Sequence, residues 1–227
     1  ILYLSLRAWH ATDSLCRAPA RTVQLLNNHS PITVATHCPH CEHKTMITFR
    51  QATHSDALFI AQGFHTAMLM SDTPESRIRL FAEKICMRDD VLYSAPNTTI
   101  VEVDGKPAGM ITAYDGSRYS DMRRVTMALV KEHMGIDLSD MEDESEAGEY
   151  YLDSLAVLPE YRGRGLGRML LKHQIDEGLR RGLNVTLAVD PVNTNAQRLY
   201  RDLGFVDMRD IYIFGHTYWK WVIPAMK

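Results

Sequence analysis

Apolar residues after residue 46 recur at regular intervals, and their spacing predicts alternating strands and helices. Residues 47–51 have the composition of a β-strand. One helical stripe is formed by residues that recur every four positions: Ile60, Phe64 and Met68. Thr53 or Ser55 can cap this helix, because a side-chain hydroxyl accepts a hydrogen bond from the free N–H groups of a first turn. A second helix is predicted over residues 74–87.

The same alternation continues through the second half of the chain. Two β-rich runs flank Asp104-Gly105, which predicts a hairpin because this dipeptide tolerates the positive φ of a tight turn. The spacing then predicts helices over 123–135, 165–181 and 194–203, strands over 150–157 and 184–190, and two final strands that meet near Gly215. This order of strands and helices indicates an α/β fold.

Residues 1–45 show no sustained helical or strand period. We therefore expect residues 46–227 to form the functional domain, with an insertion at 118–149. Residues 1–45 are expected to be an arm that is disordered or lies outside the native domain.

A possible metal motif lies in this arm. Cys38 and Cys41 have C-x-x-C spacing, among His37, His40 and His43. Structural zinc takes four ligands, usually from two such pairs. No second pair follows at the usual distance, so we predict no metal site. A zinc-linked nucleic-acid module would rest on this motif alone.

Composition narrows the class of protein further. The chain has 227 residues, of which 45% are hydrophobic and 23% charged, as in ordinary globular domains. Its net charge of −3 argues against nucleic-acid binding. No apolar run approaches the roughly 20 residues of a membrane helix. Four cysteines do not make a disulfide framework in a chain of this length, so we expect a reducing, cytoplasmic location.

The segment RGRGLG at residues 162–167 is the first candidate for chemistry. A Walker loop would need Lys and Ser or Thr after its last glycine, but Arg168 follows Gly167. A dinucleotide fingerprint would need a glycine where Arg168 stands. A third interpretation is a pyrophosphate cradle, because successive glycines and a helix N-terminus present free N–H groups to an anion. A tight structural turn is the alternative.

A second motif follows downstream, where residues 193–205 read NTNAQRLYRDLGF. With the glycine loop, it resembles the GNAT superfamily of acyl-CoA-dependent N-acetyltransferases. The family's loop pattern, Q/R-x-x-G-x-G/A, is matched by Arg162, Gly165 and Gly167. Its next pattern, N-x-x-A-x-x-L-Y-x-x-x-G-F, is matched by Asn193, Ala196, Leu199, Tyr200, Gly204 and Phe205. The similarity covers residues 46–224 and is strongest over 150–205.

The resemblance implies a mixed, mostly antiparallel sheet that splays between its fourth and fifth strands and is flanked by helices. Acetyl-CoA, the acyl-donor substrate, would lie in the splay between residues 151–157 and 185–189. Its pantetheine arm would pair with Leu155, Ala156 and Val157. Its pyrophosphate would contact Arg162, Gly163, Arg164, Gly165, Leu166 and Gly167. Asn193 would help to hold the cofactor arm or the backbone near it.

The resemblance also implies catalytic roles. Tyr200 matches the acid that protonates the leaving thiolate, and its unperturbed pKa near 10 keeps it protonated at neutral pH. Packing on the sheet is the alternative for this tyrosine. Glu149 and Asp153 are candidates for the general base, and they share strand parity with Tyr151. Each could instead be a solvated edge charge, and positioning alone could suffice for catalysis.

We therefore expect an N-acetyltransferase that transfers an acetyl group from acetyl-CoA to a primary amine by direct attack in a ternary complex. The alternative is a non-catalytic acyl-CoA sensor on the same fold. The acceptor is expected to be a small-molecule or peptide amine, and the protein a monomer or homodimer without a nucleic-acid or membrane partner. Residues 136–149 carry seven acids and no Lys or Arg, which leads us to expect a cationic acceptor. A solvated loop that touches no substrate is the alternative.

Overall fold

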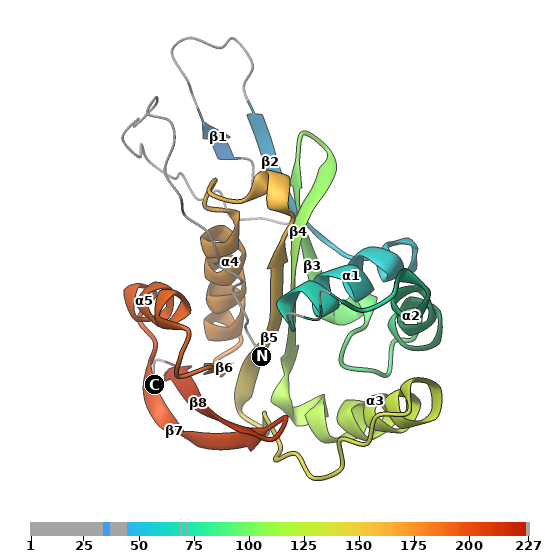
Figure 1. The fold of residues 1–227 in the computed structure, drawn as a ribbon. Coiled ribbons are helices and arrows are strands. Elements are labelled where there is room, and N and C mark those ends of the chain that lie inside the picture. The colour runs from blue at the N-terminus through green and yellow to red at the C-terminus, as the bar shows by residue number, and fades with distance from the viewer. Residues whose placement is uncertain (1–33, 37–44, 69, 71, 226–227) are drawn as a thin grey trace.

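The computed structural model describes residues 34–36, 45–68, 70 and 72–225 (Figure 1). These residues form one eight-stranded sheet in the order β1-β2-β3-β4-β5-β6-β8-β7. Its strands are β1 (Val34–Thr36), β2 (Thr45–Gln51), β3 (Thr98–Val103), β4 (Lys106–Asp115), β5 (Glu149–Val157), β6 (Asn184–Val189), β7 (Val206–Ile213) and β8 (His216–Ile223). All neighbouring pairs are antiparallel except β5 and β6. The mixed, mostly antiparallel sheet that the family resemblance implies is confirmed.

The sheet splays between β5 and β6, the fourth and fifth strands counted from residue 45. These strands pair at only three positions, from Glu149 opposite Asn184 to Tyr151 opposite Thr186. Beyond that point β5 continues to Val157 and β6 to Val189 without pairing to each other. The predicted divergence is therefore present, and it leaves one edge of β5 open.

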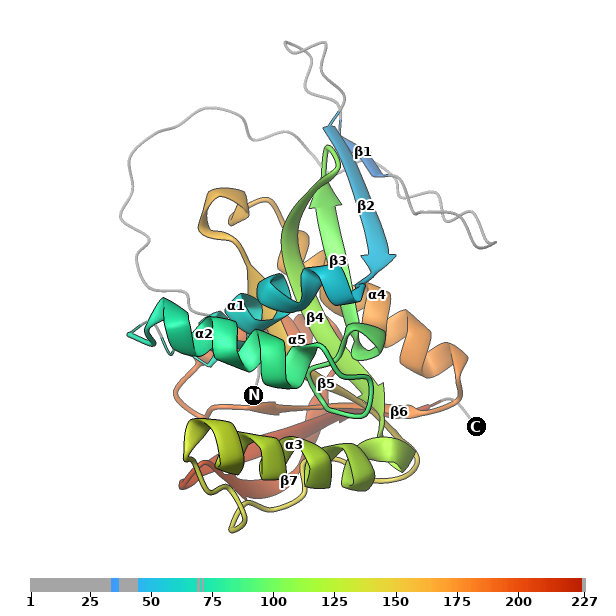
Figure 2. The same ribbon diagram turned by 90° about the vertical axis from the view of Figure 1, so that its right-hand side faces the viewer.

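Helices cover both faces of the sheet (Figures 1 and 2). One face carries α1 (Ala57–Ala67), α2 (Glu75–Phe81) and α3 (Tyr119–Met134), and the other carries α4 (Leu166–Arg180) and α5 (Thr194–Asp202). Short turns complete the element order: 3₁₀ turns at His54–Asp56, Ala95–Asn97, Gly116–Arg118 and Pro159–Tyr161, and a π turn at Ala82–Cys86. Each face has its own apolar core, because strand side chains alternate between the two sides.

Local sequence signals place most of these boundaries. Thr53 is the N-cap of the turn that leads into α1, and its backbone N–H donates to Asp56 Oδ2 at 2.9 Å. The helix predicted over 74–87 is present as α2 and the π turn that follows it. The helix predicted over 123–135 begins earlier, at Tyr119, after the turn at Gly116–Arg118.

The structure adds one strand that the sequence analysis did not assign. β1 pairs with β2, with Val34 opposite Ile47. Three residues are too few for a period-2 pattern to be distinguished in a sequence. The HCPHCEH segment lies outside the described residues, and so does most of the arm.

Candidate active site

The glycine loop connects β5 to α4 and is open on one side. Gly163 and Gly165 have φ of 75° and 78°, in the left-handed region that glycine adopts without steric cost. A Cβ at either position would meet no atom within 4 Å among the described residues. Gly165 is also the N-cap of α4, whose first N–H groups have no partner within the helix. Free donors and open space at a helix N-terminus fit an anionic group such as a phosphate.

The other residues predicted for this loop divide into two groups. Arg162 Nε donates to the Val157 carbonyl at 3.0 Å, and Arg164 Nη2 donates to the Glu160 carbonyl at 3.2 Å. Both guanidinium groups are therefore held beside the loop. Leu166 is buried in the core, where it anchors the start of α4.

The open edge of β5 leads directly into this loop. On one side, β4 pairs with β5 as far as Gly109 opposite Val157. On the other side, pairing with β6 ends at Tyr151, so Leu155, Ala156 and Val157 have no strand partner there in the described sheet. Backbone N–H and C=O groups on such an edge can pair with a ligand instead. A cleft of about 100 Å³ between α1 and the end of β5 includes Ala156, Val157 and Arg162 in its lining.

Tyr200 lies on α5 and is completely buried. Its ring makes edge contacts with Phe205 and Trp221, at centroid distances of 5.9 and 6.4 Å. Its hydroxyl has no hydrogen-bond partner among the described residues. Burial raises the pKa of Tyr200 well above its ordinary value, so the phenol keeps its proton at neutral pH. A buried hydroxyl without a partner is costly, and a bound ligand could supply one.

Asn193 has a structural role in addition to the one predicted from the family pattern. It is the N-cap of α5, and its Oδ1 accepts a hydrogen bond from the Ala196 N–H at 3.1 Å. The cap fixes the start of the helix that carries Tyr200.

Glu149 lies at the first residue of β5, where β5 and β6 still pair. Lys220 Nζ donates to its Oε2 at 2.7 Å, and both side chains are buried. Thr186 Oγ1 and the Glu146 N–H donate to the same oxygen, at 3.3 and 3.2 Å. The structure therefore places Glu149 in a buried ion pair that links β5 to β8.

Asp153 occupies a bulge in the middle of β5. Ser154 lies opposite Thr112 and Leu152 lies opposite Ala113, so Asp153 has no paired residue in β4. Its carboxylate accepts hydrogen bonds from the Tyr114 hydroxyl at 2.7 Å and from Ser154 Oγ at 2.6 Å. Although Glu149 and Asp153 share strand parity, each has its own set of partners.

Glu144 is a further buried carboxylate, and sequence reasoning missed it as a candidate. The Tyr151 hydroxyl donates to Glu144 Oε2 at 2.7 Å, and the Glu144 N–H donates to the Tyr119 hydroxyl at 3.0 Å. Burial raises the pKa of Glu144, and the charge of Asp153 adds to the increase. In the sequence Glu144 is one of several acids in an acidic run, so no local signal distinguishes it.

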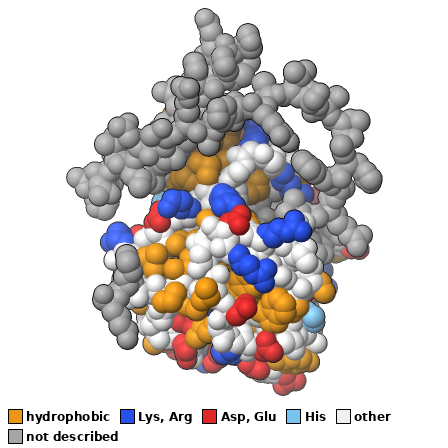
Figure 3. Space-filling view, turned by 90° about the vertical axis from the view of Figure 1, so that its left-hand side faces the viewer, with side chains coloured by type: hydrophobic (Ala, Val, Ile, Leu, Met, Phe, Trp, Pro, Cys, Tyr) orange, Lys and Arg blue, Asp and Glu red, His pale blue; other side chains and the backbone are white. Residues whose placement is uncertain are grey.

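Three of the seven acids in residues 136–149 form ion pairs with nearby cations, in addition to Glu149. Ion pairs join Lys131 to Asp137 at 2.7 Å, Arg123 to Asp143 at 3.3 Å and Arg209 to Glu142 at 3.5 Å. Charges of both signs are also interspersed over the face that carries α4 and α5 (Figure 3).

Within the described ranges, no group of three or more His, Cys, Asp or Glu side chains could hold a metal ion. In the same part of the chain, every helix is too short or too polar to cross a membrane.

Comparison with known proteins adds independent findings. A model described as the acetyltransferase (GNAT) family matches residues 64–205. The ribosomal protein bS18-alanine N-acetyltransferase of Salmonella typhimurium is 48% identical over 58 residues, which are 25% of this chain and 39% of that protein. N-alpha-acetyltransferase 40 of Saccharomyces cerevisiae is 34% identical over 88 residues, which are 35% of this chain and 31% of that protein. The matches therefore span less than half of these relatives.

Solved structures agree in fold over a longer stretch. An N-acetyltransferase from Staphylococcus aureus Mu50 superposes with a TM-score of 0.64 at 24% identity, over 77% of this chain and 99% of the other. A second acetyltransferase structure has a TM-score of 0.63 at 25% identity, over 78% of this chain and 99% of the other.

Proposed function

Because the chain belongs to the GNAT family of acetyltransferases, we propose that it transfers the acetyl group of acetyl-CoA to a primary amine of a small molecule or peptide. The amine nitrogen attacks the thioester carbonyl directly, while both substrates are bound. A C–N bond forms and the C–S bond breaks. The amine gives a proton to a base, and the departing thiolate takes a proton from an acid.

Acetyl-CoA is the donor in this family, and the open edge of β5 offers its binding surface. The pantetheine arm runs along Leu155, Ala156 and Val157 and pairs with those of their backbone groups that face the open edge. The pyrophosphate lies on the N–H groups of residues 163–167 and at the start of α4. Arg162 and Arg164, held beside the loop, add positive charge. A backbone N–H near Val157 polarises the thioester carbonyl.

Tyr200 is the proposed acid. It belongs to the same apolar core as Leu155 on β5 and Leu166 at the start of α4. Burial keeps the phenol protonated at neutral pH, so its hydroxyl is available to donate a hydrogen bond and then its proton to the thiolate as the C–S bond breaks. This function is supported by an open strand edge that leads into a phosphate cradle, and by a buried tyrosine hydroxyl that has no partner among the described residues.

Asp153 is the proposed base, with Glu144 beside it. The two carboxylates lie on the face of β5 that α1 and α3 cover, held by Tyr114 and Tyr151. A carboxylate whose pKa is raised by burial, as in Glu144, accepts a proton more readily near neutral pH. Glu149 is assigned instead to anchoring β5 against β8, because Lys220 and Thr186 already occupy its Oε2.

The acceptor is proposed to be cationic in solution. Most primary amines are protonated at neutral pH, and the exposed acids of residues 137–146 attract such ions. The attraction is weaker than the sequence suggests, since three of these acids already have cationic partners.

The experiment that tests this function measures thiol release from acetyl-CoA with a panel of primary amines. We expect turnover by the full chain. In Tyr200→Phe, kcat should fall on the order of 10²-fold while CoA affinity is kept, because the ring still packs and only the proton donor is lost. Asp153→Asn should lower kcat/KM and alter its pH profile. CoA binding without thiol release for any amine would select the sensor instead.

A further inference from the structure

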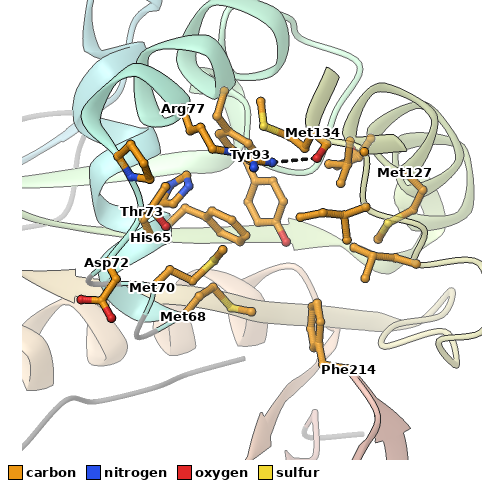
Figure 4. A pocket seen from close by; sticks show the side chains of 18 residues that line it. His65, Met68, Met70, Asp72, Thr73, Arg77, Tyr93, Met127, Met134 and Phe214 are labelled. Atoms are coloured by element: carbon orange, nitrogen blue, oxygen red, sulfur yellow. Dashed lines mark hydrogen bonds between the residues drawn. The ribbon is translucent and has the colours of Figure 1, made fainter. Parts of the chain in front are cut away.

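A large pocket lies on the face of the sheet covered by α1, α2 and α3 (Figure 4). Its volume is about 830 Å³, within the usual range for small-molecule sites. Its walls come from α1, α2, the described residues between these helices, α3, the segment after α3, Tyr93, and the turn between β7 and β8. These elements are far apart in the sequence.

The lining is mainly apolar and contains four methionines: Met68, Met70, Met127 and Met134. Phe64, Phe81 and Phe214 add aromatic surface. Methionine side chains are unbranched and polarisable, so they adapt to the shape of an apolar ligand. Figure 4 shows Met68 and Met70 below Tyr93, and Phe214 on the turn between β7 and β8.

The polar groups in the lining are few and mostly engaged. Arg77 Nη2 donates to the Met134 carbonyl at 2.7 Å. His65 Nδ1 lies 2.8 Å from the Ala61 carbonyl, and burial lowers the pKa of this imidazole, which favours its neutral form. Asp72 is the one acidic side chain among the described lining residues. Such a pocket does not match an acceptor with several positive charges.

One wall of the pocket backs onto the buried carboxylates of Asp153 and Glu144. Tyr93 lines the pocket and belongs to the same core cluster as Tyr114 and Tyr151. Tyr114 donates to Asp153, and Tyr151 donates to Glu144. Burial raises the pKa of Tyr93, and the charges of both carboxylates contribute, as expected for groups close together. An amine seated at this wall would have its proton acceptor nearby.

We propose that this pocket binds the apolar substituent of the acceptor, so that the substrate is a primary amine bearing a large apolar group. Both an arylalkyl or long-chain amine and a peptide with an apolar N-terminal residue have this chemistry. The inference rests on the acetyl transfer proposed above. Apolar burial provides the affinity, and the carboxylates behind Tyr93 orient the amine.

The test compares four acceptors with the full chain and acetyl-CoA. 4-Phenylbutylamine and the peptide Phe-Gly-Gly carry the apolar group, and glycinamide and spermidine do not. We expect kcat/KM for at least one apolar acceptor to exceed that for both polar ones by at least about tenfold. Whichever apolar acceptor is the better substrate distinguishes a free amine from a peptide. Higher kcat/KM for spermidine or glycinamide than for both apolar acceptors would overturn the proposal.

Two pocket variants and a matched control locate the effect. Met127→Gln, on α3, should lower kcat/KM for the apolar acceptor on the order of tenfold and leave glycinamide and CoA affinity unchanged. Phe214→Asn should do the same, and asparagine tolerates the φ of 53° at this turn. Met208→Gln changes an exposed methionine of β7 outside the pocket and should alter nothing. Equal losses for all acceptors would contradict the inference.

Calorimetry separates this inference from the proposed function. Binding of 4-phenylbutylamine and Phe-Gly-Gly is measured in the presence of CoA, where no turnover is needed. If either ligand binds to the wild-type chain and binds more weakly to Met127→Gln, the pocket proposal is supported even if no thiol is ever released. If neither ligand binds to the wild-type chain, the pocket proposal is wrong whatever the catalytic result.

Discussion

Two glycines at the ends of α4 show how one residue's surroundings determine its role. Gly165 precedes the helix and Gly182 follows it, with φ of 78° and 71°. A Cβ at either position would meet no described atom within 4 Å. Their backbones are thus alike, but only Gly165 belongs to the proposed phosphate cradle. Substituting each glycine in turn therefore distinguishes the effect of backbone strain, which both positions share, from the effect of blocking the ligand, which is expected only at Gly165.

We expect Gly165→Ala to weaken CoA binding by tenfold or more, because a methyl group would stand where the phosphate approaches. Gly182→Ala should leave CoA affinity unchanged. Both variants should lose about 1 kcal/mol of stability, since a non-glycine residue is strained at this φ. Calorimetry with CoA and denaturant unfolding provide the two measurements. Equal CoA affinity in the two alanine variants would rule out the cradle.

The junction between β2 and α1 depends on a clamp that spans three elements. Arg50 on β2 donates to both carboxylate oxygens of Asp56, at 2.8 and 2.9 Å, and to Glu102 on β3 at 2.7 Å. The hydrogen bonds from Arg50 lower the pKa of Asp56 to about 2. The clamp fixes the start of α1, which forms one wall of the large pocket.

Asp56→Asn should lower the free energy of unfolding by about 1 kcal/mol near neutral pH, after allowance for the partial exposure of Arg50. Because the folded-state pKa lies below the ordinary value of 3.8, the wild-type advantage is complete above pH 3.8 and disappears as the pH falls towards 2. Urea unfolding at several pH values checks this. Asp121→Asn, at an exposed carboxylate, is the control. A difference independent of pH would exclude the ion pair as its cause.

At the scale of the whole molecule, several acids that are clustered in the sequence are paired with cations or buried in the fold. The seven acids of residues 136–149 suggest a strong negative field. In the structure Glu149 pairs with Lys220 inside the sheet and Glu144 is buried, while Glu142 and Asp143 pair with arginines. Electrostatic attraction of the acceptor should therefore be modest.

Neutralising the exposed acids tests that attraction. The triple variant Asp140→Asn, Glu142→Gln and Asp143→Asn leaves Glu144 in place. We expect KM for a cationic amine to rise about twofold and to depend less on salt, because exposed charges act weakly and are screened. KM for an aromatic amine that is uncharged at neutral pH should not change. The same response for both amines would show that the acidic segment does not attract cations.

The sequence by itself determined the features that depend on neighbouring residues. Apolar spacing predicted the helix stripe through Ile60 and Phe64, and two short motifs located the glycine loop and Tyr200. Helix periods, caps and glycine turns are encoded within a few positions, so they can be read without knowing the fold. The mixed sheet and its splay followed from the family resemblance that these motifs carry.

Only the tertiary structure decided which charged groups are buried and where a ligand can enter. Glu149 meets Lys220 from a strand 71 positions later, and the large pocket joins α1 to the turn at Phe214. The bulge that isolates Asp153 depends on the register of β5 against β4. Burial, ion pairing and cavity shape arise from contacts between distant segments. Local preferences do not specify those contacts, because the same short segment can fold against many different neighbours.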